Sequence, residues 1–245
     1  MKDSVFSVIS NREIAKNTYE CVLEGDISDI TASGQFVNIK LDGFYLRRPI
    51  SVCDAEEGKL TLIYKVVGAG TEKMAEAKSG DEWLTLTGLG NGYDLTKSGD
   101  KPLLIGGGAG VPPMYMLCKK LIAEGKAPTV ILGFNTAEEV FYKEEFEKLG
   151  AKVIIATADG SVGVRGFVTD AMMGLDYTYF YTCGPEPMLK AVYSKSKTSG
   201  QFSFEERMGC GFGACMGCSC KTVTGYKRIC KDGPVLEKEE ILWEK

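Results

Sequence analysis

The stretch Leu103-Leu104-Ile105-Gly106-Gly107-Gly108-Ala109-Gly110-Val111-Pro112-Pro113 separates two kinds of sequence pattern in this chain of 245 residues. It combines a short apolar strand, a glycine-rich turn and the start of a helix. The prolines suit that start, because the first turn of a helix leaves its N–H groups unpaired in any case. The apolar residues that follow recur on one helix face; they are Met114, Leu117, Cys118, Leu121 and Ile122. The stretch therefore predicts a strand–turn–helix unit.

Downstream of this stretch, strand-like and helix-like segments alternate. Strands are expected at 130–134, 153–157 and 177–183, and helices at 138–149, 167–173 and 187–194. Such alternation is typical of a doubly wound parallel α/β sheet. We place this domain at residues 99–200.

Upstream, apolar residues occupy every second position, with Gly and Asp at the breaks. The strand-like runs are 5–9, 19–23, 37–41, 60–66 and 84–86, and a short helix is expected near 72–77. This pattern predicts an antiparallel barrel or sandwich over residues 1–98. The chain is thus an α+β multidomain protein in which residues 201–245 form a third, small unit.

The third unit is rich in Cys and Gly. It contains Cys210-Gly-Phe-Gly-Ala-Cys215-Met-Gly-Cys218, and Cys230 follows. A C-x4-C-x2-C run with a distant fourth Cys is the spacing of plant-type ferredoxins, where four thiolates hold a 2Fe–2S cluster. Its glycines allow the backbone to fold closely around such a cluster. We therefore predict that Cys210, Cys215, Cys218 and Cys230 are cluster ligands.

Two other interpretations of these cysteines remain open. Structural zinc sites usually consist of two C-x2-4-C knuckles, and this segment has no paired second knuckle, but a zinc site with four Cys ligands is the nearest alternative. Unliganded thiols are the other. Cys220 is a fifth candidate ligand, and we expect it to be spare because the spacing selects Cys218.

Composition limits the chemistry. The chain has no histidine, which excludes a histidine general base, a Ser–His or Cys–His nucleophile pair and any His-ligated metal. Hydride and single-electron transfer suit such a chain, because a cofactor performs the difficult step. The net charge of −4 argues against nucleic acid as a partner. With no long apolar run and no signal peptide, we expect a cytoplasmic protein that does not bind membranes.

The glycine turn is a candidate phosphate-binding loop, because it joins a strand to a helix N-terminus. Gly107, Gly108 and Gly110 are the candidate nucleotide contacts. Val111 stands where a third motif glycine would be, so a plain strand–helix turn is equally compatible with the sequence. The stretch 135–142 contains two Glu and no Arg, which favours NADH over NADPH because a 2′-phosphate requires cations.

A second candidate contact follows the last predicted strand, in Cys183-Gly184-Pro185-Glu186-Pro187-Met188. Ligands of doubly wound sheets bind at the carboxyl ends of the strands. Cys183 and Gly184 are therefore candidates for a position near a nicotinamide ring. A buried Cys acting as a small hydrophobic residue is an equal alternative.

Four motifs in this order resemble the ferredoxin–NADP reductase family. They are Arg48-Pro49-Ile50-Ser51, Gly68-Ala69-Gly70-Thr71, Gly106–Pro113 and Cys183–Met188. The cysteine loop, continuing into Cys230-Lys231-Asp232-Gly233-Pro234, is similar to one branch of it, the electron-transfer subunits of NAD-dependent (class 1B) dihydroorotate dehydrogenases. The resemblance covers essentially the whole chain.

The resemblance implies an FAD-binding barrel domain at 1–98, an NAD-binding domain at 99–200 and a 2Fe–2S unit at 201–245. The implied FAD contacts are Arg48, Pro49, Ile50, Ser51, Ile63, Tyr64, Lys65, Gly70 and Thr71. Arg48 would pair with the pyrophosphate, and the Ser51 hydroxyl would lie near flavin N5. From the residues alone, Arg48 would be a surface charge and Ile63 and Tyr64 barrel core. Ile50 departs from the family, many members of which have Tyr there.

The function that the resemblance implies is an electron relay between NAD(H), FAD and the cluster. The implied partner is an FMN-containing catalytic subunit that oxidises dihydroorotate to orotate in pyrimidine biosynthesis, in a heterotetramer with two copies of each subunit. One alternative is a reductase subunit of a related flavin/iron–sulfur complex, of the sulfide dehydrogenase or ferredoxin–NAD(P) type. Another is a zinc-bearing nucleotide-binding regulator.

Overall fold

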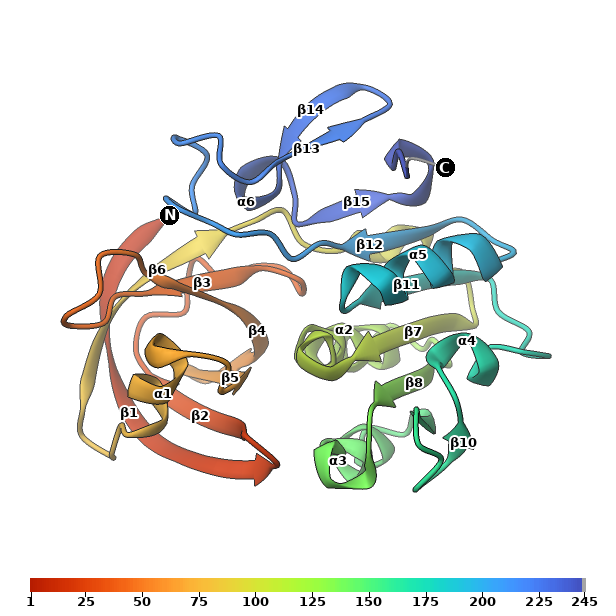
Figure 1. Ribbon diagram of the computed structural model, residues 1–245, viewed down its shortest axis with the longest axis horizontal. Coiled ribbons are helices and arrows are strands. Elements are labelled where there is room, and N and C mark those ends of the chain that lie inside the picture. The colour runs from red at the N-terminus through yellow and green to blue at the C-terminus, as the bar shows by residue number, and fades with distance from the viewer. Residues whose placement is uncertain (244–245) are drawn as a thin grey trace.

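Six antiparallel strands close into a barrel in the order β1-β2-β5-β4-β3-β6 (Figure 1). This computed structural model describes residues 1–243. The barrel elements are β1 (Lys2–Ala15), β2 (Thr18–Glu24), β3 (Phe36–Ile39), β4 (Arg48–Glu56), β5 (Lys59–Lys65), α1 (Ala69–Ala75) and β6 (Glu82–Leu89). Phe6, Val37, Leu62 and Met74 of α1 are fully buried in its core. The expected antiparallel domain is therefore a closed barrel.

The alternation of apolar residues did not predict one strand of the barrel, β4. β4 carries no clear alternation, because its first four residues are all half-buried and full burial comes only at Val52 and Cys53. This is the strand that contains Arg48-Pro49-Ile50-Ser51. A strand with one end open to a cleft does not show the period of two that identifies its neighbours.

The second half of the chain forms a seven-stranded sheet in the order β10-β9-β8-β7-β11-β12-β15. Its strands are β7 (Pro102–Gly107), β8 (Thr129–Phe134), β9 (Lys152–Thr157), β10 (Val164–Arg165), β11 (Tyr179–Cys183), β12 (Gly200–Ser203) and β15 (Val235–Glu237). All neighbours pair in parallel except β12 and β15, which are antiparallel. The predicted parallel sheet is present, with an antiparallel strand added at one edge.

Helices cover both faces of this sheet. They are α2 (Pro112–Ala123), α3 (Lys143–Lys148), α4 (Val168–Ala171) and α5 (Glu186–Lys195). Leu104 packs with residues of α2 and α3, whereas its neighbours Leu103 and Ile105 pack with α4 and α5. The sheet is thus doubly wound, as the alternation of strands and helices predicts. No helix among residues 1–243 is long and apolar enough to cross a membrane.

The helix predicted at 138–149 is interrupted. A 3-10 turn covers Ala137–Glu139, and α3 begins only at Lys143. The break lies at Tyr142, which has a left-handed backbone with φ of 63°. Its hydroxyl donates to Glu20 Oε2 of the barrel at 2.8 Å. A contact between domains therefore overrides the local helical pattern here.

The C-terminal unit consists of an irregular loop, the hairpin β13 (Ser219–Thr222) and β14 (Gly225–Arg228), the short helix α6 (Ile229–Asp232) and β15 (Figure 1). Further 3-10 turns lie at Leu95–Lys97, Gly108–Gly110 and Lys238–Glu240. Since β15 belongs to the sheet, the sheet extends across the boundary predicted at residue 200. The division into 1–98, 99–200 and 201–245 stays a prediction.

Asn91 joins the end of the barrel to this unit. Its Nδ2 donates to Val235 O at 2.8 Å, and its Oδ1 accepts from Val235 N at 3.1 Å. Its backbone N–H donates to Gly233 O at 2.8 Å. The side chain thus satisfies both backbone groups of the first residue of β15.

We predict that Asn91→Ala lowers the free energy of unfolding by about 1–3 kcal/mol, because two backbone groups lose their partner. The control is Lys97→Ala, which removes an exposed ion pair to Glu237 of β15, at 2.7 Å, and should cost less than about 1 kcal/mol. Urea unfolding of both variants measures the difference. Equal losses would contradict the role given to Asn91.

Candidate functional site

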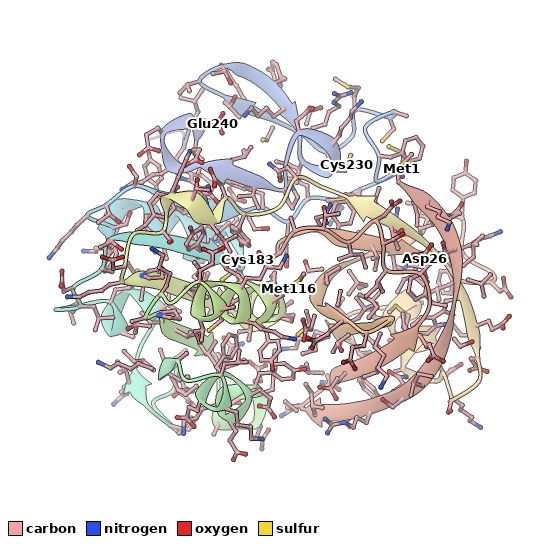
Figure 2. The ribbon with its side chains drawn as sticks, turned by 180° about the vertical axis from the view of Figure 1, so that it is seen from behind. Met1, Asp26, Met116, Cys183, Cys230 and Glu240 are labelled. Carbon is pink, nitrogen blue, oxygen red and sulfur yellow. The ribbon has the colours of Figure 1, made fainter. Side chains whose placement is uncertain are left out.

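A cleft of about 390 Å³ opens between the barrel and the sheet. Predicted site residues line it; they are Arg48, Pro49, Ile50, Ser51, Ile63, Tyr64, Lys65, Thr71 and Cys183. They come from β4, β5, α1 and the end of β11, so four separate elements meet at this point. Figure 2 shows Cys183 near the middle of the molecule, with Cys230 higher, in the C-terminal unit. The structure therefore brings the predicted flavin residues together with one predicted nicotinamide contact.

Arg48 lies next to the first turn of α1, beside Gly70. Its guanidinium packs over the ring of Phe44, with Cζ 4.6 Å from the ring centroid. A Cβ at Gly70 would collide with the same guanidinium, so the glycine makes room for it. Among residues 1–243 no carboxylate forms an ion pair with Arg48. One guanidinium N–H donates to Leu46 O at 2.5 Å, but the charge of Arg48 has no carboxylate partner and can attract an anionic ligand in the cleft.

The neighbouring Thr71 has a local structural role. Its Oγ1 accepts hydrogen bonds from the N–H groups of Val67 and Gly68, at 2.9 and 3.3 Å. These bonds fix the turn that leads into α1. The turn holds Gly70 against Arg48, which explains why residues far apart in sequence share this part of the cleft.

The three β5 residues differ in what their side chains do. Ile63 belongs to the cluster between barrel and sheet, whereas Tyr64 belongs to the barrel core. The Tyr64 ring stacks on Tyr19 with centroids 5.9 Å apart, and its hydroxyl donates to Asn11 Oδ1 at 2.9 Å. The barrel-core interpretation of the Tyr64 ring is thus the one that the structure supports, although the residue also lines the cleft.

Lys65 forms an ion pair with Glu139 across the junction of barrel and sheet, at 2.8 Å. The hydrogen bond from Lys65 is the main reason why the pKa of Glu139 is lowered. Glu138 is paired in the same way with Lys16, at 2.7 Å. The two acidic residues on which the prediction of NADH rests are therefore paired with lysines of the barrel.

The glycine turn is packed against the end of β11. A Cβ at Gly110 would collide with Cys183 O, and one at Gly107 would collide with Met188 Sδ. Gly108 has a left-handed φ of 50° and open space beside it. These predicted glycines do not line the cleft itself, but Gly107 and Gly110 admit the Cys183–Gly184 turn at close range. The two predicted nucleotide motifs therefore pack directly against each other.

The sequence pattern missed the segment after β12. Ser203, Phe204, Glu205, Glu206 and Met208 all line the cleft. Cys183 is buried and lies beside Ser203 in the parallel register of β11 and β12. Glu205 is exposed on this wall, and partial desolvation by the cleft raises the pKa of its carboxyl group. A Glu-Glu-Arg run resembles an ordinary exposed linker, so the sequence held no signal for this wall.

Backbone N–H groups of the cysteine loop donate to two of its thiols. Those of Ala214 and Cys215 donate to Cys210 Sγ, at 3.2 and 3.4 Å. Burial raises the pKa of Cys210, but N–H groups of the loop, including those of Cys215 and Ala214, lower it to about 6 overall. Cys230 N–H donates to Cys218 Sγ at 3.4 Å. Backbone donors therefore already surround the sulfur atoms.

Tight backbone turns and an ion pair hold this loop. Gly211 and Gly213 have left-handed φ of 79° and 91°. Arg228 donates to Gly213 O at 3.0 Å and forms an ion pair with Asp232 at 2.9 Å. The hydrogen bond from Arg228 lowers the pKa of Asp232 to about 2. Arg228 thus links the loop at Gly213 to Asp232 of α6.

The donors of this loop fit a 2Fe–2S cluster. Each iron of such a cluster takes two thiolates, and backbone N–H groups that donate to the sulfur atoms, as those to Cys210 and Cys218 do, tune its potential. Cys220 lies in β13 opposite Lys227 and lines a different cavity, together with Trp243.

Comparison with known families agrees with this geometry. Residues 205–242 match the iron–sulfur cluster binding domain of dihydroorotate dehydrogenase B, and residues 104–194 match the oxidoreductase NAD-binding domain. The dihydroorotate dehydrogenase B (NAD(+)) electron transfer subunit of Shouchella clausii is 43% identical, over 98% of both chains. That of Fusobacterium nucleatum is 44% identical, over 98% of this chain and 99% of its own.

This chain belongs to the dihydroorotate dehydrogenase B electron transfer subunit family.

The fold of this electron transfer subunit family member also occurs in solved structures. A chain of the NADH-dependent reduced ferredoxin-NADP oxidoreductase, determined in work on flavin-based electron bifurcation, has a TM-score of 0.89. It is 29% identical and covers 97% of this chain and 90% of its own. A ferredoxin NADP+ reductase from Neisseria gonorrhoeae with bound FAD and NADP shares the fold, with a TM-score of 0.69 at 16% identity, over 80% of this chain and 90% of its own.

We predict that Cys218→Ser abolishes the iron–sulfur content of this family member, whereas Cys220→Ser retains it. Cys218 is buried beside Cys230, and Cys220 points to another cavity. Iron and acid-labile sulfide per protein, with the visible spectrum, measure the outcome. The reverse result would mean that Cys220 is the ligand.

Proposed function

We propose that this chain carries electrons between NAD(H) and the dihydroorotate-oxidising subunit of an NAD-dependent dihydroorotate dehydrogenase. The observation that carries the proposal is the continuity of the cleft and the cysteine loop. Glu206 and Met208 line the cleft, and Cys210 follows in the same irregular segment. The identity of 43% to a named electron transfer subunit, over 98% of the chain, supports the same activity.

The cleft is the proposed FAD site. Arg48 would bind the pyrophosphate with Gly70 and Thr71 beside it, because a guanidinium matches two phosphate oxygens. Pro49, Ile50 and Ser51 on β4 and Ile63, Tyr64 and Lys65 on β5 would line the isoalloxazine. FAD, when bound, supplies hydride exchange with a nicotinamide and release of electrons one at a time.

The joined glycine turn and β11 end form the proposed NAD(H) site. Gly107, Gly108 and Gly110 would admit the pyrophosphate, and Cys183 and Gly184 would orient the nicotinamide at the edge of the cleft. NADH is the proposed co-substrate, since Lys16 and Lys65 are engaged by Glu138 and Glu139.

The proposed ligands of the 2Fe–2S cluster are Cys210, Cys215, Cys218 and Cys230, with Cys220 spare. The cluster supplies one-electron transfer when bound. Cys215 is exposed, as are the apolar side chains of Phe212 and Met216 on the same loop. An exposed loop suits exchange with a second protein. We propose the FMN-containing catalytic subunit as that partner, in a cytoplasmic heterotetramer with two copies of each subunit.

A second candidate is a reductase subunit of a different flavin/iron–sulfur complex. The observation that favours it is the similarity to the NADH-dependent reduced ferredoxin-NADP oxidoreductase chain, with its TM-score of 0.89. That chain is 29% identical, below the 43% and 44% of the electron transfer subunits. The electron transfer subunit is therefore the first candidate.

A visible spectrum of the purified chain tests the relay, with iron, sulfide, zinc and flavin content. We expect flavin and iron–sulfur bands, and bleaching of both by NADH. A colourless protein with one zinc per chain would refute the relay. Copurification from the native host decides the partner: a dihydroorotate-oxidising subunit is expected, and association with another oxidoreductase alone would refute the pyrimidine assignment.

We predict that Arg48→Ala weakens FAD binding by about ten- to a hundred-fold, because a charged hydrogen bond contributes about 1.5–3 kcal/mol. The control is Arg47→Ala. The adjacent Arg47 forms a two-point ion pair with Asp3, at 2.6 and 3.1 Å, and does not line the cleft. Titration of the flavin-free variants with FAD measures both affinities. Unchanged affinity in Arg48→Ala would remove Arg48 from the site.

A further inference from the structure

Asn38 is a buried polar side chain to which neither the cleft nor the cysteine thiols give a role. It is 1% exposed and lies on β3, whose other residues, Phe36, Val37 and Ile39, are apolar and buried. Among residues 1–243 its Oδ1 has no hydrogen-bond partner. Burying an amide is costly unless its hydrogen bonds are satisfied, so its contacts show what it contributes.

Within the described part of the chain, the one side-chain hydrogen bond of Asn38 reaches the cysteine loop. Its Nδ2 donates to the backbone carbonyl of Cys210 at 3.3 Å, across 172 positions of sequence. Figure 1 shows the segment before β13 passing close to β3 and β6 at the top of the barrel. The bond therefore joins the barrel to the first proposed cluster ligand.

The next loop residue is packed on the same amide. A Cβ at Gly211 would collide with Nδ2 of Asn38, and Gly211 has a left-handed φ of 79°. The loop can therefore approach the amide only with a glycine at this position. Arg228 binds the same loop at Gly213 O, so Asn38 and Arg228 hold two of its carbonyl groups, three residues apart.

Asn38 also lies beside β4, the strand that lines the proposed FAD cleft. In the barrel register Asn38 pairs with Pro49 of β4, and Pro49, Ile50 and Ser51 line the cleft. Its backbone carbonyl accepts from Arg47 at 3.5 Å. One buried residue is thus in contact with the cleft-forming strand on one side and with the cysteine loop on the other.

We propose that Asn38 is a positioning residue that seats the cysteine loop on the strand beside the cleft, and so fixes the distance between the two redox groups. The inference rests on the proposed function, which places FAD in the cleft and the cluster in the loop. Functional groups must be held within about 0.5 Å by residues that are themselves locked, and a buried strand residue meets that condition. Electron transfer falls steeply with distance, so a loop that loses this anchor slows the transfer.

The test compares Asn38→Leu with the wild-type protein, both loaded with flavin and cluster. Leucine keeps the bulk of the side chain and removes the donor to Cys210 O. The control is Thr85→Val on β6, the residue that pairs with Ile39 of β3; it removes another buried barrel hydrogen bond, to Trp83 O at 3.3 Å, and leaves the donor to Cys210 O in place. Urea unfolding establishes how much each variant destabilises the barrel.

Three measurements separate positioning from general stability. Rapid mixing with NADH records bleaching of the flavin and of the cluster as separate phases. Electron paramagnetic resonance records the reduced cluster, and hydrogen–deuterium exchange records the amides of Ala214 and Cys215, which donate to Cys210 Sγ. In Asn38→Leu we expect unchanged flavin bleaching, a cluster phase slower by about ten-fold, an altered resonance spectrum and faster amide exchange. Thr85→Val should match the wild type in all of these.

Two outcomes overturn the proposal. One is a wild-type cluster phase and resonance spectrum in Asn38→Leu. The other is an equal slowing in Asn38→Leu and Thr85→Val, which would show a general effect of barrel stability. If the wild-type protein itself lacks flavin and cluster bands, the proposed function fails, and that result is distinguishable from either of these.

A double-mutant cycle covers the case in which Asn38→Leu does not fold. Gly211→Ala alone should slow the cluster phase, because the new Cβ collides with Asn38. Asn38→Ala removes the atoms in that collision. We expect the double variant to be slowed less than the product of the two single effects, since residues in contact are not additive. Strictly additive effects would overturn the contact on which the proposal depends.

Discussion

The antiparallel pairing of β15 with β12 is the constraint on which the candidate site depends. The chain leaves the sheet after Ser203 and returns to the same strand at Val235, which faces Ser203 in the register. Phe204 N–H donates to Pro234 O at 3.0 Å and closes the base of this excursion. Both ends of the cysteine unit are therefore fixed at the carboxyl end of the sheet, beside Cys183. A loop closed in this way starts and finishes at the wall of the cleft.

Much of the site could be predicted from the sequence, because its signals are local. The glycine turn after an apolar strand, the spacing of Cys210, Cys215 and Cys218, and the alternation of strands and helices all lie within short windows. The packing of the two nucleotide motifs against each other could not be predicted, because it arises only in the folded chain. Gly110 contacts the backbone of Cys183, and no window contains both residues.

The residues that the sequence did not reveal act through long-range contacts. β4 shows no alternation because one end faces the cleft, and β15 is too short to carry a pattern. Glu205 is an ordinary linker residue until β12 places it in the wall of the cleft. Asn38 is a polar residue in an otherwise apolar strand, and its proposed role depends on a hydrogen bond to a loop far along the chain. The proposed role of Arg48 came from the resemblance to the reductase family, because composition and periodicity gave no signal for it.

The two sides of the junction between barrel and sheet are held by different forces. At the nucleotide side the contacts include two ion pairs, Lys16 with Glu138 and Lys65 with Glu139, of which the first is largely exposed. Exposed ion pairs contribute little net stability and are screened by salt. At the cysteine side the contacts are amide hydrogen bonds from Asn91 and Asn38 to backbone groups. Such bonds have fixed geometry, and leaving them unmade is costly. The fold is therefore firm where two redox groups must keep a constant separation, and more easily adjusted where a nucleotide must enter and leave.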